Sequence, residues 1–128
     1  MHTAQTHTHH TAWRRSAFAA LTALLLLAAI AGCLVLGQGW WQLVAFGLAP
    51  DLALLAGAGS GLAKGQLHPR AVRLYNALHS YWGPLLLGLA AIVLPAGFLI
   101  GALAWAFHIS LDRTVGYGMR TRDGFQRS

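Results

Sequence analysis

The chain reads SAFAALTALLLLAAIAGCLVLGQGWWQLVAFGLAP from Ser16 to Pro50 without a charged residue. As one α-helix these 35 residues would be about 53 Å long, at about 1.5 Å per residue. The hydrocarbon core of a bilayer is only about 30 Å thick. A turn signal, Gly37-Gln38-Gly39, lies within the stretch. We therefore expect two membrane spans here, over residues 16–36 and 40–56.

A second uncharged stretch, residues 74–111, has the same property. Its 38 residues would make a helix of about 57 Å, and Pro95-Ala96-Gly97 provides the turn. It predicts spans over residues 74–94 and 96–112. The expected fold is therefore an all-α bundle of four transmembrane helices over residues 14–118. A disordered His/Thr-rich tail (residues 1–13) would precede it, and a basic cytoplasmic tail (residues 119–128) would follow it.

The composition agrees with a membrane protein. Hydrophobic residues make up 56% of the chain and charged residues 9%, with a mean hydropathy of +0.53, whereas charged residues are about a quarter of an average soluble domain. These values exclude a disordered protein. The single cysteine excludes a module held by internal disulfides. No aromatic and basic platform for a nucleic-acid strand is present, so we expect no nucleic-acid partner.

The basic residues predict the orientation of the bundle. All nine precede the first span, lie in or beside the middle loop, or follow the last span, and the other two connections carry none. Because basic loops stay in the cytoplasm, both termini and the middle loop are expected there. The net charge of +6 would then face anionic lipid headgroups. The nine residues are Arg14, Arg15, Lys64, Arg70, Arg73, Arg113, Arg120, Arg122 and Arg127.

The first span has an alternative interpretation. Arg14-Arg15, an apolar run and Ile30-Ala31-Gly32-Cys33 are similar to a lipoprotein signal, whose cleavage would leave Cys33 lipidated. The apolar run continues past the cysteine through Leu36, which favours a retained span with Cys33 facing lipid. The preceding tail contains four histidines that could bind metal ions non-specifically: His2, His7, His9 and His10.

Few polar side chains lie within the expected spans, and each is a functional candidate. Burying a charge near the bilayer centre costs about 2.5–3.5 kcal/mol on insertion scales. From the expected span ends, Asp51, His79 and His108 would each lie about 7–9 Å inside the cytoplasmic end. Asp112 would lie about one turn nearer to that end. Side chains from three helices are therefore expected to meet in one layer.

The spacing on each helix supports a shared site. His108 and Asp112 stand four residues apart, which places them on one helix face. Pro50 should bend its helix beside Asp51 and leave the Phe46 carbonyl without its usual partner. Imidazole and carboxylate ligands suit Zn²⁺, and carboxylates also suit Mn²⁺ or Fe²⁺. The predicted ligands are Asp51, His79, His108 and Asp112, supported by Tyr75, Asn76, Ser110 and Arg113.

The polar layer has two alternative roles that stay open. Asp51 could pair with Arg73 or Arg113 while each histidine acts as a neutral hydrogen-bonding residue, so that the network only fixes helix packing. A proton or ion pathway would need polar residues in the outer half of the bundle as well. The outer halves of the first, third and fourth spans are apolar, which argues against a pathway.

Three segments of the sequence resemble bacterial domain-of-unknown-function family 4260. They are Leu48-Ala49-Pro50-Asp51-Leu52, Tyr75-Asn76-Ala77-Leu78-His79-Ser80-Tyr81, and the H-x3-D-R-x2-G-Y-G stretch from His108 to Gly118, with Gly124-Phe125 beyond. The resemblance covers roughly residues 15–126. It implies a small multi-pass protein of the bacterial inner membrane and brings no established activity.

The same residues are more weakly similar to membrane-bound metal-dependent hydrolases related to zinc phospholipase C and P1 nuclease. Pro50-Asp51, His79-Ser80 and His108-x3-Asp112 would correspond to residues that hold one zinc of a multi-metal cluster in that superfamily. The ligands for the other metals have no counterpart here. The likeness implies hydrolysis of a lipid or another small phosphate ester at the cytoplasmic leaflet, with Arg113 and Arg120 orienting the phosphate. The alternative is a non-catalytic membrane module. The sequence leaves the oligomeric state open.

Overall fold

The computed structural model describes the backbone of residues 3–127 and the side chains of residues 9–127. The regular structure of this part is helical, apart from an isolated antiparallel bridge between Arg120 and Gln126. Two short 3-10 turns, η1 (Ala49–Asp51) and η2 (Pro69–Ala71), accompany the α-helices. The α-helices are α1 (Thr3–Leu36), α2 (Trp40–Leu48), α3 (Leu52–Ala56), α4 (Val72–Leu78), α5 (Trp82–Ala90) and α6 (Gly97–Val115).

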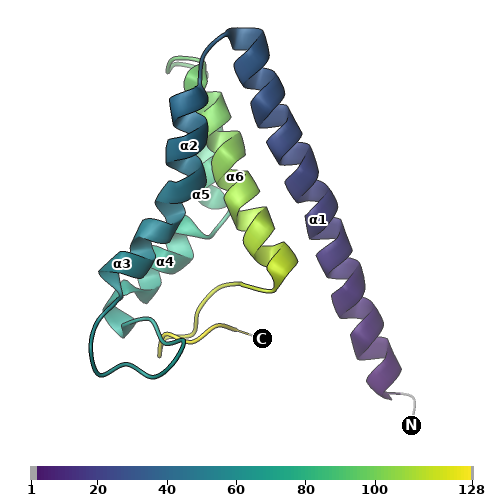
Figure 1. Cartoon of the computed structure of the whole chain (residues 1–128), viewed down its shortest axis with the longest axis vertical. Coiled ribbons are helices and arrows are strands. Elements are labelled where there is room, and N and C mark those ends of the chain that lie inside the picture. Colours follow the sequence, from purple (N-terminus) through teal and green to yellow (C-terminus); the bar gives the residue numbers. More distant parts are fainter. Residues whose placement is uncertain (1–2, 128) are drawn as a thin grey trace.

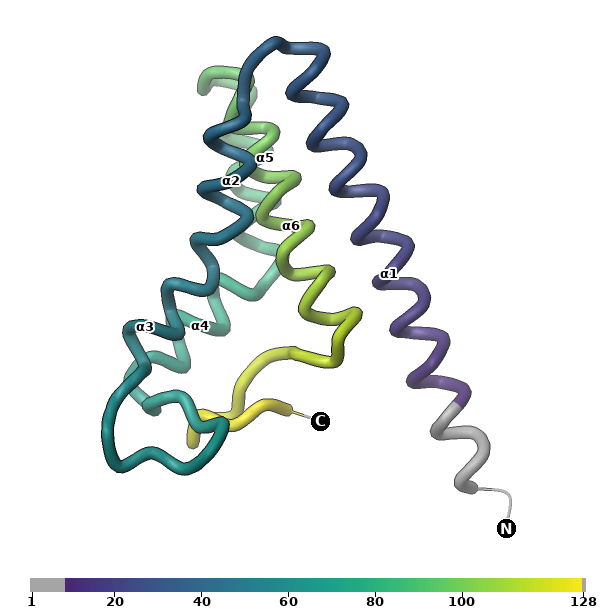
Figure 2. Tube along the Cα trace, viewed as in Figure 1, coloured from purple at the N-terminus to yellow at the C-terminus, as the bar shows by residue number. Residues whose placement is uncertain are grey.

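The chain runs along the length of the molecule in four passes of alternating direction (Figure 1). It ascends along α1, descends along α2 and α3, ascends along α4 and α5, and descends along α6 (Figure 2). The amino-terminal end of α1, the loop between α3 and α4, and the carboxy-terminal segment therefore lie at the same end of the molecule (Figure 1). This end carries the segments that hold the basic residues. The order of passes is the one that the two uncharged stretches predict.

Two of the four passes are single helices that are long and apolar enough to cross a membrane. These are the described part of α1, His9–Leu36, with a mean hydropathy of 2.6, and α6, with 1.2. The fourth expected span, residues 96–112, agrees with α6 to within three residues. The other two passes differ from the prediction, because each is interrupted. The structure thus supports the all-α class and two candidate spans, a coarser result than four continuous helices.

Prolines account for both interruptions. The expected span over residues 40–56 is α2, η1 and α3 in sequence, with Pro50 inside η1. The expected span over residues 74–94 is α4 and α5, separated at residues 79–81. Pro84 lies four residues after Ser80 and cannot donate to its carbonyl, so an α-helix cannot continue through this point. Helix α5 ends at Ala90, and turns follow to Leu94.

Helix α1 is longer than the span predicted for it. Its residues 9–13, which the sequence assigns to the tail, are helical with exposed side chains. No glycine or proline occurs between Thr3 and Ala31, so nothing in the sequence ends the helix before Trp13. The described part of the chain has no helix end at the predicted boundary of residue 13.

Small residues bring α6 close to both α1 and α2. Cys33 is fully buried with Ala29 and Ile100 in a cluster between α1 and α6, so the expectation that it faces lipid is wrong. Gly97 and Gly101 lie against Gln42 and Phe46 of α2, where an added Cβ would come within 2.6 Å of either side chain. The Gly97-x3-Gly101 pair therefore serves packing within the chain.

The outer surface is strongly apolar. Val35, Ile92 and Val93 are more than four-fifths exposed, whereas His79 and Ser110 are completely buried. Large exposed apolar areas are unusual on soluble monomers, so a surface of this kind agrees with a lipid environment.

Candidate metal centre

Four of the few polar side chains in the helical region meet at one point. Asp51 comes from η1, His79 follows the last residue of α4, and His108 and Asp112 both lie on α6. One nitrogen or oxygen atom of each residue lies within 4.8 Å of the corresponding atom of every other. The structure thus brings together all four residues that the sequence predicts as ligands, from three separate passes.

Four of the six distances among the ligand atoms fit a tetrahedral metal ion, and the other two, nitrogen to nitrogen and oxygen to oxygen, are at most 4.8 Å. A tetrahedral ion with bonds of about 2.0–2.2 Å separates its ligand atoms by about 3.3–3.6 Å. His79 Nε2 lies 3.5 Å from Asp51 Oδ1 and 3.2 Å from Asp112 Oδ2. His108 Nε2 lies 3.2 Å and 3.6 Å from the same two oxygens. All four nitrogen–oxygen separations therefore match the edges of such a tetrahedron to within about 0.1 Å.

Hydrogen bonds at the opposite ring nitrogens determine the tautomer of both histidines. His79 Nδ1 lies 2.8 Å from the Tyr75 carbonyl oxygen, and His108 Nδ1 lies 2.8 Å from that of Gly47. A carbonyl can only accept, so each Nδ1 carries a proton and donates it. Each Nε2 is buried without a hydrogen-bond partner among the described residues. Both imidazoles thus direct Nε2 at the two carboxylates, the orientation that metal-ligating histidines adopt.

The interruption after α2 supplies the carbonyl that orients the His108 ring. The last carbonyls of an α-helix have no partner inside the helix. Gly47 lies in the last turn of α2, just before η1. The Tyr75 carbonyl in the last turn of α4 also accepts the His79 backbone amide at 3.0 Å, so it is shared between that amide and the His79 ring. The sequence predicts a free carbonyl at Phe46, whereas His108 uses the neighbouring Gly47. The bend at Pro50 thus positions Asp51 and also provides a partner for His108.

Side chains from α6 satisfy the other carbonyls at the interruption between α4 and α5. Trp105 Nε1 donates to the Leu78 carbonyl at 2.7 Å, and Arg113 Nη2 donates to the His79 carbonyl at 2.9 Å. Gly83 makes room for the Trp105 ring, which an added Cβ would strike. Neither Gly83 nor Trp105 was predicted from the sequence. The Gly83-Pro84 pair, a common breaker signal, could have indicated the interruption.

Two of the four predicted supporting residues touch the histidines. The Tyr75 ring stacks on the His79 ring with centroids 3.9 Å apart, and Arg113 holds the His79 carbonyl. Asn76 instead bonds both backbone groups of Arg120. Ser110 lies 2.7 Å from the Tyr81 hydroxyl. Asn76 and Ser110 therefore form their side-chain hydrogen bonds with residues outside the cluster.

Arg120 has a structural role that the sequence did not indicate. Its guanidinium lies 4.8 Å above the Tyr75 ring and donates to the carbonyls of Gly65 and Gly124. Gln126 Nε2 donates to the Tyr75 hydroxyl at 3.3 Å. The carboxy-terminal segment thus covers the outer face of Tyr75, whose inner face supports His79. Arg120 therefore has a structural role, while its role in orienting a phosphate stays a prediction.

Access to the cluster is uneven. The side chains of His79 and His108 are 0% and 9% exposed and that of Asp112 is 19% exposed, but Asp51 is 51% exposed. Among the described residues, both carboxylates lie within 3.6 Å of the imidazole Nε2 atoms, and neither Arg73 nor Arg113 forms an ion pair with Asp51. Any exchange with the surroundings would occur on the side of Asp51.

A family model described as a domain of unknown function, DUF4260, matches residues 18–128. The chain belongs to this family. The match includes all four clustered residues and the carboxy-terminal segment, and it confirms the resemblance that the sequence motifs indicated. No curated protein and no solved structure matches the chain. The likeness to metal-dependent hydrolases therefore rests on the sequence motifs alone.

Proposed function

We propose that the protein is a multi-pass membrane protein that binds one divalent metal ion, Zn²⁺ foremost, through Asp51, His79, His108 and Asp112. The observation that carries this proposal is the pair of buried Nε2 atoms without a hydrogen-bond partner. Each is held in the metal-binding tautomer by a backbone carbonyl. Leaving two such atoms buried beside two carboxylates is costly unless something binds all four.

The donor set favours Zn²⁺ and suggests a structural role. Two neutral imidazoles and two carboxylates would leave a bound divalent ion with no net charge, which suits a site beside lipid. Four protein ligands complete a tetrahedral shell, as in structural zinc sites. An ion held there would tie together η1, the end of α4 and α6.

Metal analysis of the purified full-length protein tests the proposal. Because the histidines near the amino terminus could bind metal by themselves, we would use a parent chain in which His2, His7, His9 and His10 are alanine. This parent should retain one divalent ion per chain. His79→Ala and His108→Ala should each lose it, because each removes a buried ligand that no other side chain can replace. His68→Ala, outside the cluster, is the matched control.

A parent that purifies folded but free of divalent metal, and that gains none on adding Zn²⁺, would overturn the proposal. It would support the alternative, in which protonated imidazoles pair with the two carboxylates and the network only fixes helix packing. The four nitrogen–oxygen distances of 3.2–3.6 Å are the observation that favours this second candidate.

Hydrolysis of a phosphate ester is a further candidate activity, favoured by the exposure of Asp51. A bound ion would supply a Lewis acid and a water of lowered pKa. Catalytic sites keep a ligand position open, and here only the Asp51 side faces outward. For catalysis, Asp51 would have to leave its coordination position or share it with the bound water. We expect slow, metal-dependent cleavage of bis-p-nitrophenyl phosphate that His108→Ala abolishes. Equal rates in the parent and His108→Ala would exclude this activity.

The proposed location is the bacterial inner membrane, with four passes and both termini in the cytoplasm. The arrangement of the passes, the apolar outer surface and the basic residues at one end support it. The interrupted passes are compatible with a membrane because their free carbonyls accept hydrogen bonds from buried side chains. Anionic lipids of the inner leaflet are the expected partners of the basic end.

A further inference from the structure

Four arginines from three separate segments line one cavity at the basic end of the molecule. Arg14 and Arg15 come from α1, Arg113 from α6, and Arg127 from the carboxy-terminal segment. The cavity has a volume of about 390 Å³ and is bordered by α1, the end of α6 and the carboxy-terminal segment. The Arg15 guanidinium approaches Gly116 so closely that an added Cβ would come within 2.8 Å of it. Segments distant in the sequence therefore bring these positive charges together.

These arginines have no acidic partner among residues 9–127. The chain contains three acidic residues, Asp51, Asp112 and Asp123. Asp51 and Asp112 face the two histidines, and no carboxylate of the described residues lies within ion-pair distance of an arginine. Gathering like charges without a counter-charge is unfavourable. Guanidinium groups bind phosphate with paired, charge-assisted hydrogen bonds, so a phosphate group is the complementary occupant.

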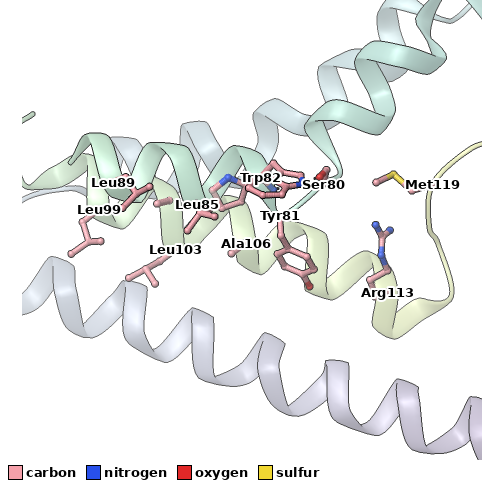
Figure 3. A pocket seen from close by; sticks show the side chains of 13 residues that line it. Ser80, Tyr81, Trp82, Leu85, Leu89, Leu99, Leu103, Ala106, Arg113 and Met119 are labelled. Carbon is pink, nitrogen blue, oxygen red and sulfur yellow. Dashed lines mark hydrogen bonds between the residues drawn. The ribbon is translucent and has the colours of Figure 1, made fainter. Parts of the chain in front are cut away.

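An apolar groove adjoins the arginine cavity. It runs between α5 and α6, has a volume of about 810 Å³ and is lined by leucines, Gly88, Ala102 and Ala106. Leu89 and Leu99 lie at one end, and Tyr81, Arg113 and Met119 lie at the other (Figure 3). Arg113 and Met119 line both spaces. A ligand with a charged head and an apolar tail could therefore occupy both spaces at once.

We propose that the two spaces form one binding site for a phosphate-bearing lipid. The phosphate lies among Arg14, Arg15, Arg113 and Arg127, and one acyl chain lies along the groove between α5 and α6. A lipid fits better than a free anion, because a free anion would leave the adjoining groove unused. None of these arginines is a predicted metal ligand. Arg113 also donates to the carbonyls of His79 and Tyr117, so the test of the charges changes Arg14 and Arg15, which do not contact the metal centre.

Titration of the detergent-purified full-length protein with dioctanoyl phosphatidic acid tests the site. We expect saturable binding by calorimetry. Inorganic phosphate, which has the head alone, and dioctanoylglycerol, which has the tail alone, should each bind at least about tenfold more weakly. Phosphate binding as tight as that of the lipid would overturn the lipid assignment. Uptake of the lipid without saturation would overturn the site.

A charge-matched pair of double variants separates the cavity from general electrostatic attraction. Arg14→Gln/Arg15→Gln should weaken binding of the lipid about tenfold or more. These side chains lie on the exposed start of α1, so the bundle should still fold. Arg70→Gln/Arg73→Gln removes the same charge from exposed positions outside both spaces. It should leave the affinity within about twofold. Equal weakening by both pairs would overturn the proposal.

Filling the groove tests the tail without touching the charges. Gly88 lines the groove, and an added Cβ would meet only Ala102, at an ordinary 3.8 Å. Gly88→Leu should therefore fold while occupying the space of the acyl chain. It should weaken dioctanoyl phosphatidic acid but leave the weak binding of inorganic phosphate unchanged. Unchanged lipid affinity in this variant, with a melting temperature equal to that of the parent, would place the tail elsewhere and overturn the groove assignment.

Discussion

At the scale of single residues, the two carboxylates of the cluster are chemically alike but differ in exposure. Asp112 is 19% exposed and follows His108 by one helical turn, whereas Asp51 is 51% exposed in a 3-10 turn. A ligand position open to the surroundings can be filled by water after its side chain is altered. A less exposed position is harder for water to fill. The two aspartates should therefore contribute unequally to metal affinity.

We expect Asp112→Asn to weaken Zn²⁺ binding by more than about 100-fold, since residues that only support ligands already act on a 10–100-fold scale. Asp51→Asn should weaken it less. Competition with a chromogenic chelator measures both affinities. Asp123→Asn, which alters the one acidic residue outside the cluster, is the control and should match the parent. Equal losses at Asp51 and Asp112 would contradict the inferred difference in access.

At the scale of elements, the interruptions of the second and third passes position the side chains of the candidate metal centre. A continuous helix would turn its carbonyls to its own amides, whereas α2 ends where its Gly47 carbonyl receives the His108 ring. Helix α4 ends at Leu78, where the His79 ring folds back onto the Tyr75 carbonyl. Pro50 and Pro84 enforce these ends. The interruption at residues 79–81 also lets Trp105 and Arg113 of α6 dock on the freed backbone.

Pro84→Ala tests this view of the third pass. The new amide can donate to the Ser80 carbonyl, so α4 and α5 should merge toward one helix. His79 would turn away from the cluster. We expect higher helicity by circular dichroism together with a loss of Zn²⁺ affinity of about tenfold or more. Pro95→Ala, in the turn before α6, is the matched control. Unchanged affinity with raised helicity would show that the interruption does not position His79.

The sequence predicted the four clustered residues well because their depth follows from span ends and helical rise. Charges and turn signals likewise predicted the order of passes. The interruption after Leu78 was missed because the uncharged residues 74–94 are long enough for one membrane span. The breaker signal Gly83-Pro84 within them was not taken into account. The partners of Asn76, Ser110 and Arg120 could not be predicted. They depend on how the carboxy-terminal segment and α5 pack, which local pattern does not encode.

At the scale of the whole molecule, the four passes return both chain ends and the loop of residues 57–68 to one end (Figure 1). The turns at residues 37–39 and 91–96 lie at the other end. In the proposed topology, the positive-inside rule would place this basic end in the cytoplasm.

Cysteine labelling in intact bacteria checks this orientation. In a Cys33→Ala background, Gln38→Cys should react with a maleimide that does not cross the inner membrane, because residue 38 lies in the predicted outer turn. Ser60→Cys, in the middle loop, should react only after the cells are opened. Both positions are exposed, so neither is hidden by packing. Reaction of both positions in intact cells, or of Ser60→Cys alone, would contradict the proposed topology.

The carboxy-terminal segment has a consequence for biosynthesis. Gly124 accepts from the Leu67 amide with a φ of 97°, so close to the Leu67 backbone that a side chain would collide with it. Beside it, Gln126 and Arg120 hold Tyr75 against His79. These residues are translated after all the helices of the described chain, which end with α6 at Val115. If the centre binds a metal ion as proposed, it would be completed only after α6 has been made: a nascent chain truncated before Gly124 would contain all four predicted ligands, but its His79 would lack this backing.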